Sequence, residues 1–193
     1  MEIGTNLFVC SVCKSRQSSL LLKREVVHPL WWMDDKPDTM TLRYVICEAC
    51  GYIQLHPHLS QKEYDEIYRL TPGLDLKTLS EDRKKMLHLR KAFILKHADE
   101  LKNGTVIEAG PAYGDFLVMF DSFKRRIGIE PSETYHGLVA KERPELEYYS
   151  CLLEDFLNTE PGFKECADLV TACHVLEHAF NPSDFIKELS KLV

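Results

Sequence analysis

The chain has 193 residues, of which 45% are hydrophobic and 28% charged, which is typical of a soluble globular domain joined to a small module. No apolar run approaches the ~18 residues that a membrane span needs, and the N-terminus lacks the basic and apolar regions of a signal peptide. The formal net charge of −6 argues against a large phosphate-binding surface. We therefore expect a cytoplasmic protein without membrane contact, whose seven cysteines form no disulfide framework.

Residues 1–60 carry two pairs of cysteines, each with two residues between its members: Cys10 and Cys13, then Cys47 and Cys50. That spacing lets a tight turn direct both sulfur atoms at one ion, and four thiolates suit tetrahedral zinc. Redox chemistry and buried thiols are the alternatives, but two pairs in one small module favour structural zinc. The long spacer between the pairs requires a hairpin or a small sheet, with a predicted turn at residues 34–38 and a strand at residues 42–47.

Further residues near these pairs are open to more than one interpretation. His56 and His58 are either substitute metal ligands or, as we favour, surface imidazoles in a linker. Lys14 and Gly51 directly follow the two pairs, where they suit a knuckle turn. Residues 1–60 contain six Lys and Arg against six Asp and Glu, whereas phosphate binding requires a basic face. The module is therefore not predicted to bind nucleic acid.

Residues 61–103 are predicted to form a helical linker. Ser60 is placed to cap a helix that runs toward Leu70, and the Thr-Pro-Gly sequence at residues 71–73 breaks it. Ser80 is placed to cap a second helix, in which apolar residues recur at helical spacing until Asn103 and Gly104.

Residues 104–193 alternate between short apolar strands and helices. Strands are predicted at residues 105–109, 126–130, 146–150 and 168–173. Helices are predicted near residues 114–123, 133–141 and 153–157, and again after Asn181, which is placed as an N-cap with Pro182 at the first helical position. Repeated strand–helix–strand units predict a parallel sheet with right-handed crossovers.

Two glycines, Gly110 and Gly114, follow the first of these strands. A cofactor approaches the backbone closely at such a turn, where a Cβ would clash. The amides at the start of the next helix suit a carboxylate or a phosphate. A dinucleotide fingerprint has the pattern GxGxxG, but here Ala112 and Asp115 replace its second and third glycines. This departure counts against NAD.

Acidic residues lie at or shortly after the ends of the first three predicted strands. Glu108 suits a site that must hold a cationic amine, which favours S-adenosylmethionine, although it could also cap nearby backbone. Glu130 can accept hydrogen bonds from both ribose hydroxyls of either cofactor. Asp155, followed by Phe156, is placed to accept from an adenine amino group, with a plain helix N-terminal acid as the alternative.

These motifs resemble, in kind and order, those of the zinc-ribbon class of S-adenosylmethionine-dependent methyltransferases that includes the sugar C-methyltransferases of deoxysugar pathways. The resemblance covers almost the whole chain. The matching segments are the two cysteine pairs with CGYIQL at residues 50–55, the tyrosine-rich residues 64–68, EAGPAYGDF at 108–116, GIEPS at 128–132 and ADLVTACHVLEHAFNPSDF at 167–185.

The resemblance implies an α/β fold, in which a zinc-ribbon module (1–60) and linking helices (61–103) precede a partial Rossmann-like parallel sheet (104–193) of strand order 3-2-1-4. It implies zinc and S-adenosylmethionine as cofactors and methyl transfer to carbon or oxygen of a small, sugar-like metabolite. The cofactor residues that it implies are Glu108, Ala109, Gly110, Gly114, Glu130, Pro131, Asp155, Phe156, Cys173 and His174.

The resemblance also implies residues that face the substrate. His178 matches the family's substrate-facing histidine and is the candidate base, because an unperturbed imidazole titrates near neutral pH. The alternative is a histidine that packs in the turn at a helix start. Tyr64 or Tyr68 resembles an aromatic hydroxyl that the N-terminal region of family members contributes to the site.

Two alternative functions follow from the same sequence. One is an RNA methyltransferase whose zinc ribbon grips RNA, and the charge balance counts against it. The other is an inactive fragment that binds a cofactor or a partner. The resembling family has further strands, and its sugar-methylating members have another C-terminal domain, whereas this sequence ends at Val193. We therefore expect a partial domain that self-associates through the edge of its fourth strand and has weak or no activity alone.

Overall fold

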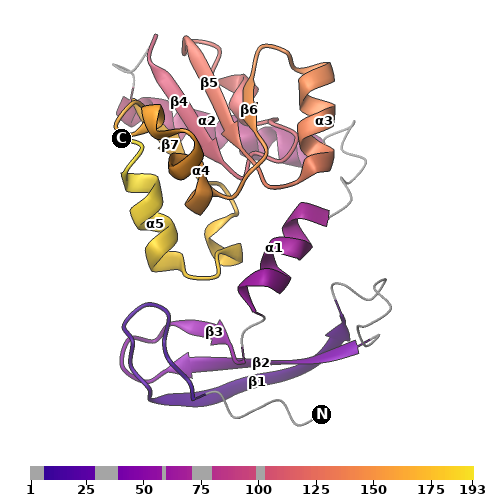
Figure 1. The fold of residues 1–193 in the computed structure, drawn as a ribbon, viewed down its shortest axis with the longest axis vertical. Helices are drawn as coiled ribbons and strands as arrows, with labels where there is room; N and C mark the ends of the chain where they lie inside the picture. Colours follow the sequence, from indigo (N-terminus) through magenta and orange to yellow (C-terminus); the bar gives the residue numbers. More distant parts are fainter. Residues whose placement is uncertain (1–6, 29–38, 58–59, 71–79, 99–102) are drawn as a thin grey trace. The chain divides into compact units, whose positions relative to one another are not determined.

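The computed structural model describes residues 7–28, 39–57, 60–70, 80–98 and 103–193. These residues belong to two compact units (Figure 1), Met1–Ile67 with Phe180–Ser183 and Tyr68–Ala179 with Asp184–Val193. The predicted turn at residues 34–38, the predicted helix break at 71–73 and His58 lie outside the described residues. The predicted domain limits at residues 60 and 103 stay predictions. No helix in the described ranges combines the length and the apolar character needed to cross a membrane.

The first unit holds a three-stranded antiparallel sheet with the strand order β1-β2-β3. Its strands are β1 (Ser18–Val27), β2 (Thr39–Cys47) and β3 (Ile53–Leu55), so the strand predicted at residues 42–47 lies within β2. Among the described residues of this unit, the buried hydrophobic core consists of Phe8, Cys10, Val45 and Cys47. These four side chains bury too little apolar surface to stabilise a fold by themselves.

Two helices follow, and both begin at the predicted serine caps. At the start of α1 (Gln61–Leu70), the Ser60 hydroxyl accepts from the Glu63 backbone N–H at 3.3 Å, and Glu63 accepts from the Ser60 backbone N–H at 2.9 Å. This reciprocal pair is a capping box. At the start of α2 (Glu81–Ala98), the Ser80 hydroxyl accepts from the Arg83 N–H at 3.3 Å.

The second unit holds a four-stranded parallel sheet with the order β6-β5-β4-β7, which confirms the order 3-2-1-4. The strands are β4 (Thr105–Ala109), β5 (Arg125–Ile129), β6 (Glu147–Tyr149) and β7 (Leu169–Thr171). The helices are α3 (Glu133–Glu142), α4 (Leu153–Thr159) and α5 (Pro182–Ser190), with 3₁₀ turns at η2 (Leu117–Met119), η3 (Pro161–Phe163) and η4 (Leu176–His178). Strand β7 lies at the edge of this sheet, where another chain could pair with it. Self-association through β7 stays a prediction.

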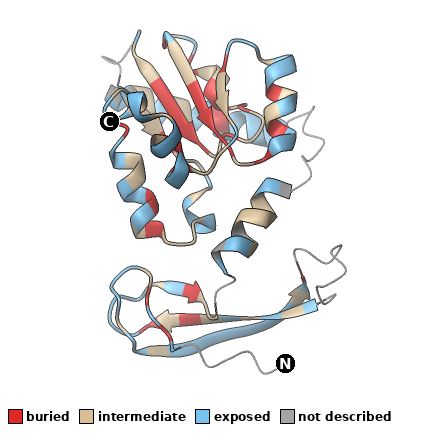
Figure 2. Cartoon of the chain, in the orientation of Figure 1, coloured by how far each residue is buried: buried red, intermediate tan, exposed pale blue. Residues whose placement is uncertain are grey.

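Buried residues run along the two central strands β4 and β5 (Figure 2). Successive strand side chains point to opposite faces of a sheet. On one face Ile107 and Ile129 pack with residues of α4 and α5, and on the other Val106 packs with residues of α2, α3 and η2. Glu108 shares the face of Val106 by the same alternation, so the acid points toward the side of the sheet that α2 covers.

One predicted helix is wrong. The segment predicted to be helical near residues 114–123 contains only the short 3₁₀ turn η2. Gly114 has a φ of 77°, in the left-handed region, which an α-helix excludes. The ring of Phe120 stacks edge-on against Phe116 and Phe123, with centroids 5.0 and 5.7 Å apart. Core packing of these rings therefore overrides the helical periodicity.

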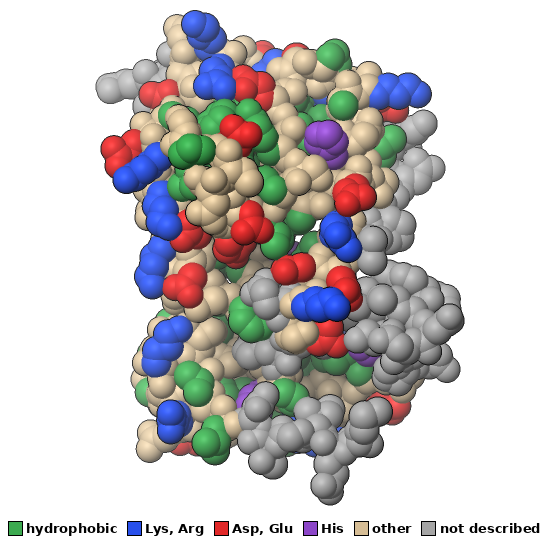
Figure 3. Space-filling model, in the orientation of Figure 1, with side chains coloured by type: hydrophobic (Ala, Val, Ile, Leu, Met, Phe, Trp, Pro, Cys, Tyr) green, Lys and Arg blue, Asp and Glu red, His purple; other side chains and the backbone are tan. Residues whose placement is uncertain are grey.

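The surface of the described residues carries both positively and negatively charged side chains. On the face shown in Figure 3, Lys and Arg side chains are interspersed with Asp and Glu side chains. Ion pairs such as Arg125 with Glu147 at 2.6 Å and Lys187 with Asp184 at 2.9 Å contribute to this mixture. Interspersed charge differs from the basic stripe that a phosphate backbone requires.

Candidate functional site

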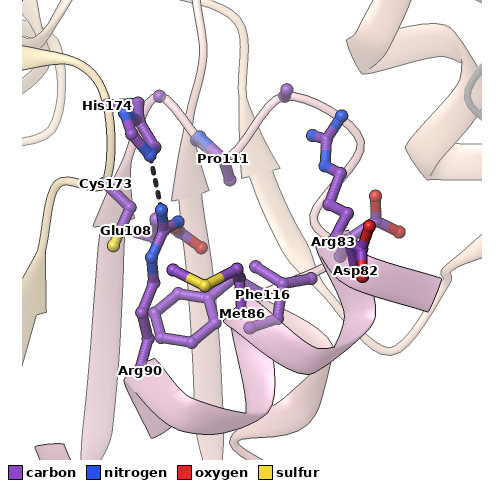
Figure 4. Close-up of a pocket in the computed structure, with 13 residues that line it drawn as sticks. Asp82, Arg83, Met86, Arg90, Glu108, Pro111, Phe116, Cys173 and His174 are labelled. Carbon is purple, nitrogen blue, oxygen red and sulfur yellow. Dashed lines mark hydrogen bonds between the residues drawn. The ribbon is translucent and has the colours of Figure 1, made fainter. Parts of the chain in front are cut away.

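A cavity of about 510 Å³ lies in the second unit beside the C-terminal ends of β4 and β7 (Figure 4). Its volume is typical of small-molecule sites. Helix α2 forms one wall, the turn after β4 forms another, and Cys173 and His174 after β7 form the third. Of the predicted cofactor residues, Glu108, Gly110, Cys173 and His174 line this cavity. It lies outside the carboxyl ends of parallel strands, where open α/β sheets bind their ligands.

The turn after β4 requires its first glycine for a reason that the sequence does not reveal. Gly110 has a φ of 67°, and a Cβ built there would lie 2.5 Å from a methyl carbon of Val175. The side chain of Val175 therefore fills the position that a Cβ at Gly110 would take, and close approach of a cofactor to this turn stays a prediction. The Gly110 N–H donates to the Ile129 carbonyl at 2.8 Å, which ties the turn to the adjacent strand.

Glu130 holds the same turn from the end of β5. Its carboxylate accepts from the Ala112 N–H at 3.0 Å and from the Ser132 N–H at 3.1 Å. Burial raises the pKa of Glu130, and these two N–H donors oppose the shift. The Tyr148 hydroxyl donates to the Ala112 carbonyl. A carboxylate has about four acceptor positions, so Glu130 retains capacity for a ribose, and that role stays a prediction.

Arg143, directly after α3, clamps the other end of the turn. Its guanidinium donates to the Gly114 carbonyl at 3.0 Å and to the Asp115 carboxylate at 2.5 Å. The same group lies over the Tyr113 ring, 4.3 Å from the centroid. Because a planar guanidinium can make all three contacts at once, one side chain fixes residues 113–115.

Replacing Arg143 with Ala should therefore loosen the turn and lower the unfolding temperature of the second unit. The loss of charge-assisted hydrogen bonds at a mostly buried site should cost about 2 kcal/mol, or about 5 °C. Arg143→Lys should restore less than half of the lost unfolding free energy, because an ammonium can reproduce neither the paired N–H donors of a guanidinium nor its stacking on the Tyr113 ring. Thermal unfolding checks this, with Arg125→Ala as the matched control. Arg125 pairs with Glu147 on a more exposed surface, where ion pairs contribute little. Equal decreases in unfolding temperature for Arg143→Ala and Arg125→Ala would contradict the role of Arg143 in fixing the turn.

Glu108 is the most perturbed acid of the cavity. It is 2% exposed, and its Oε2 has no hydrogen-bond partner within the described residues. Burial raises its pKa to about 8, and the nearby positive charge of Arg90 opposes that shift. Thr171, its register partner on β7, also has a buried side-chain oxygen without a partner in the same part of the chain. Buried polar atoms normally have partners, so the unpartnered oxygen of Glu108, which lines the cavity, fits a ligand that brings a donor.

Arg90 on α2 extends toward His174 across the cavity, and a hydrogen bond joins the two side chains (Figure 4). Since a guanidinium can only donate, His174 Nε2 accepts and its Nδ1–H faces Glu177, 3.3 Å away. The sequence motifs do not include Arg90. One signal could have identified it, because Arg90 lies three residues after the buried Leu87 and four before the half-buried Ile94. An arginine on the apolar stripe of a helix often serves a site.

The remaining predicted cofactor residues lie outside the cavity lining. Ala109 is buried in the core, and Pro131 follows β5. Asp155 is exposed in the first turn of α4, where an adenine contact stays a prediction. Phe156 is fully buried against Tyr149 and Phe163, and both pairs of ring centroids are 5.1 Å apart. Its ring is therefore engaged in core packing, and the adenine contact stays a prediction.

Two of the predicted substrate-facing residues, Tyr68 and His178, do not line this cavity. His178 is exposed at the end of η4, four residues after His174. Its ring centroid lies 5.7 Å from that of Tyr68 on α1, so the structure brings these two predicted residues together. The side chain of Tyr64 lies outside the described residues.

The four predicted metal ligands converge in the first unit. All four sulfur atoms lie within 4.8 Å of one another, with Cys10 Sγ 3.7 Å from Cys50 Sγ and Cys13 Sγ 3.5 Å from Cys47 Sγ. Zinc–sulfur bonds of ~2.3 Å place tetrahedral sulfurs about 3.8 Å apart, so the donor set fits zinc. His56 does not belong to this cluster of described residues and packs its ring against Phe8.

Both cysteine knuckles have the expected turn geometry. The Lys14 N–H donates to the Cys10 carbonyl at 3.0 Å, and the Gly51 N–H donates to the Cys47 carbonyl at 2.9 Å. Both residues after the pairs have positive φ, 63° for Lys14 and 74° for Gly51. Burial opposes ionisation of the Cys47 thiol, but N–H donors of its own turn, together with the thiols of Cys13 and Cys50, outweigh burial and lower its pKa to about 6. The turn thus stabilises the thiolate that a metal ion requires.

One comparison with known proteins gives a match that covers a large part of the second unit. Residues 107–193 match the protein-family model described as a methyltransferase domain. The match begins within β4 and includes the glycine turn, Glu130 and both histidines after β7. No curated protein matches the chain.

Proposed function

Because residues 107–193 form an S-adenosylmethionine-dependent methyltransferase domain, we propose that the chain methylates a small, sugar-like metabolite at carbon or oxygen. The buried carboxylate of Glu108 carries the cofactor part of this proposal. It faces a cavity of suitable size beside a glycine turn, and one of its oxygens lacks a donor. A cationic amine supplies that donor and compensates the buried charge.

The chain's own residues fit the parts of S-adenosylmethionine. Glu108 would hold the ammonium group, Glu130 the ribose hydroxyls, and Asp155 the adenine amino group. When bound, the cofactor supplies a methyl group on a sulfonium that is open to nucleophilic attack. The clamp of Arg143 on residues 113–115 keeps the turn in one conformation, so binding requires little reorganisation.

The zinc ion of this proposal is structural. Cys10, Cys13, Cys47 and Cys50 would hold it in the first unit, away from any role in methyl transfer. The near balance of six basic and six acidic residues over residues 1–60 supports a small-molecule substrate over RNA. The sugar-like class rests on the resemblance of the motifs.

His178 is proposed to remove a proton from the substrate's nucleophilic group. It is exposed, and Tyr68 lies against its ring, which limits the orientations of the imidazole. Tyr68, or Tyr64, would direct a hydroxyl toward the substrate. General base catalysis by a positioned imidazole contributes roughly 100-fold or more in rate.

Methyl transfer to a panel of nucleotide sugars, with RNA transcripts as a second panel, tests this function. We expect labelled methyl groups from S-adenosylmethionine in a nucleotide sugar. His178→Gln should lower kcat by roughly 100-fold with unchanged cofactor affinity. His88→Gln, at an exposed position on α2, is the matched control and should keep full activity. Label in RNA alone would replace the sugar proposal with the RNA one, and cofactor binding without any transfer would favour a binding protein.

A further inference from the structure

Strand β1 leaves one edge of the antiparallel sheet without a partner strand in the described part of the chain. It is the first strand in the order β1-β2-β3, and it is 10 residues long. Its side chains are exposed along almost the whole strand (Figure 2), and those of Leu20, Leu21 and Leu22 are each more than half exposed. Such an edge presents backbone N–H and C=O groups to which another strand can add.

The strand carries both devices that usually protect an open edge, a bulge and charged side chains. The bulge lies between Leu20 and Leu22, so residues 22–27 form a regular ladder with β2. Three charged residues lie in the middle of that regular segment, in the order Lys-Arg-Glu at positions 23–25. Because these charges are of mixed sign, they repel an incoming strand in one register and attract it in another. The edge is therefore selective for the sequence of the strand that it accepts.

A second copy of β1 fits this edge in one antiparallel register. Opposite residues of such a pair point to the same face of the sheet, so a shift by a single residue is excluded. When Arg24 lies opposite Arg24 of the second copy, Lys23 lies opposite Glu25 on both sides of the twofold axis, and Leu22 lies opposite Val26. The neighbouring registers place Lys23 opposite Lys23 or Glu25 opposite Glu25. We propose that β1 pairs with β1 of a second copy in the first of these registers, which joins two sheets into one.

The second copy also offsets a repulsion within the chain. Lys23 lies opposite Arg43 of β2, and like charges directly opposite each other destabilise a sheet. Neither side chain has an ion-pair partner within the described residues. Glu25 of the second copy lies on the other side of Lys23, and because this carboxylate accepts from the Thr39 hydroxyl of its own chain at 3.1 Å, it retains acceptor positions for the lysine. The like-charged pair that remains is Arg24 with its own copy, and both of these side chains are exposed.

Sedimentation equilibrium of the full zinc-loaded chain tests the inference, and we expect wild type to dimerise reversibly as its concentration rises. Glu25→Lys makes both Lys–Glu pairs repulsive and should raise the dimer dissociation constant roughly 10- to 100-fold. Lys23→Glu combined with Glu25→Lys exchanges the two charges and should restore the wild-type constant within about threefold. Arg24→Thr removes the like-charged pair and should lower the constant roughly 2- to 5-fold. Glu145→Lys makes the same change of charge at an exposed position of the second unit and should leave the constant unchanged.

Three results would overturn the inference, and none of them bears on the proposed methyl transfer. The first is a wild type that stays monomeric up to about 1 mM. The second is a dimer that Glu25→Lys leaves intact, which would form through another surface such as the edge of β7. The third is a double exchange that does not restore association, which would exclude the register. Should Glu25→Lys fail to fold, unchanged or weaker association of Arg24→Thr still overturns the pairing.

Discussion

Removal of zinc should unfold the antiparallel sheet of the first unit and leave the parallel sheet of the second unit folded. In the part of the first unit that the structure describes, four hydrophobic residues form the buried core, and two of them, Cys10 and Cys47, are proposed ligands. Zinc binding to such modules is worth about 10–16 kcal/mol, which matches or exceeds the whole stability of an ordinary domain. Hydrogen exchange after addition of a chelator should show loss of protection in β1 and β2 and none in β4 and β5.

Two cysteine variants separate the metal from simple packing. Cys47→Ser removes one of four ligands and should reproduce the effect of the chelator. Cys166→Ser changes a half-buried thiol of the second unit that lies outside the cluster and should leave β1 and β2 protected. Metal analysis that finds no zinc in protein purified without chelator would refute the site, as would equal effects of the two variants.

The unliganded chain should lose stability between about pH 5 and pH 8 because of Glu108. Its pKa is about 8 in the folded chain against 4.5 for an ordinary glutamate, so the folded state binds the proton more tightly. This contribution is fully present below the unfolded pKa. It decreases by about 1.4 kcal/mol per pH unit until the folded pKa is passed, and the total loss is on the order of 5 kcal/mol. Burial of a charge without a hydrogen-bonded partner is the cause.

Glu108→Gln should remove this pH dependence, because glutamine keeps the shape of the protonated acid and cannot ionise. Chemical unfolding of both forms should give similar free energies at pH 5, and at pH 8.5 the variant should be more stable than wild type. Glu145→Gln, at an exposed acid before β6, should follow the wild-type curve. Parallel curves for wild type and Glu108→Gln across this range would show that the buried carboxylate is ionised in the folded chain.

Local sequence patterns determined the elements of this fold and their order. The first strand of the parallel sheet was predicted with its observed bounds, Thr105–Ala109, and the helix caps at Ser60 and Ser80 form as predicted. The order β6-β5-β4-β7 and the convergence of four cysteines were predicted as well. Hydrophobic alternation, cap chemistry and cysteine spacing act over a few residues, so they can be recognised before the chain is folded.

Contacts between distant segments were decided by the tertiary structure alone. The ring of Phe156 packs in the core with Tyr149 and Phe163, which no local pattern indicates, and its predicted adenine contact stays a prediction. Likewise, no local sequence pattern predicts that Arg143 holds the glycine turn or that Arg90 approaches Glu108. Each depends on which face of a helix packs against the sheet, and that choice minimises exposed apolar surface over the whole unit. The packing of α2 against the sheet therefore places Arg90, a charged side chain on the packed face of that helix, in the site.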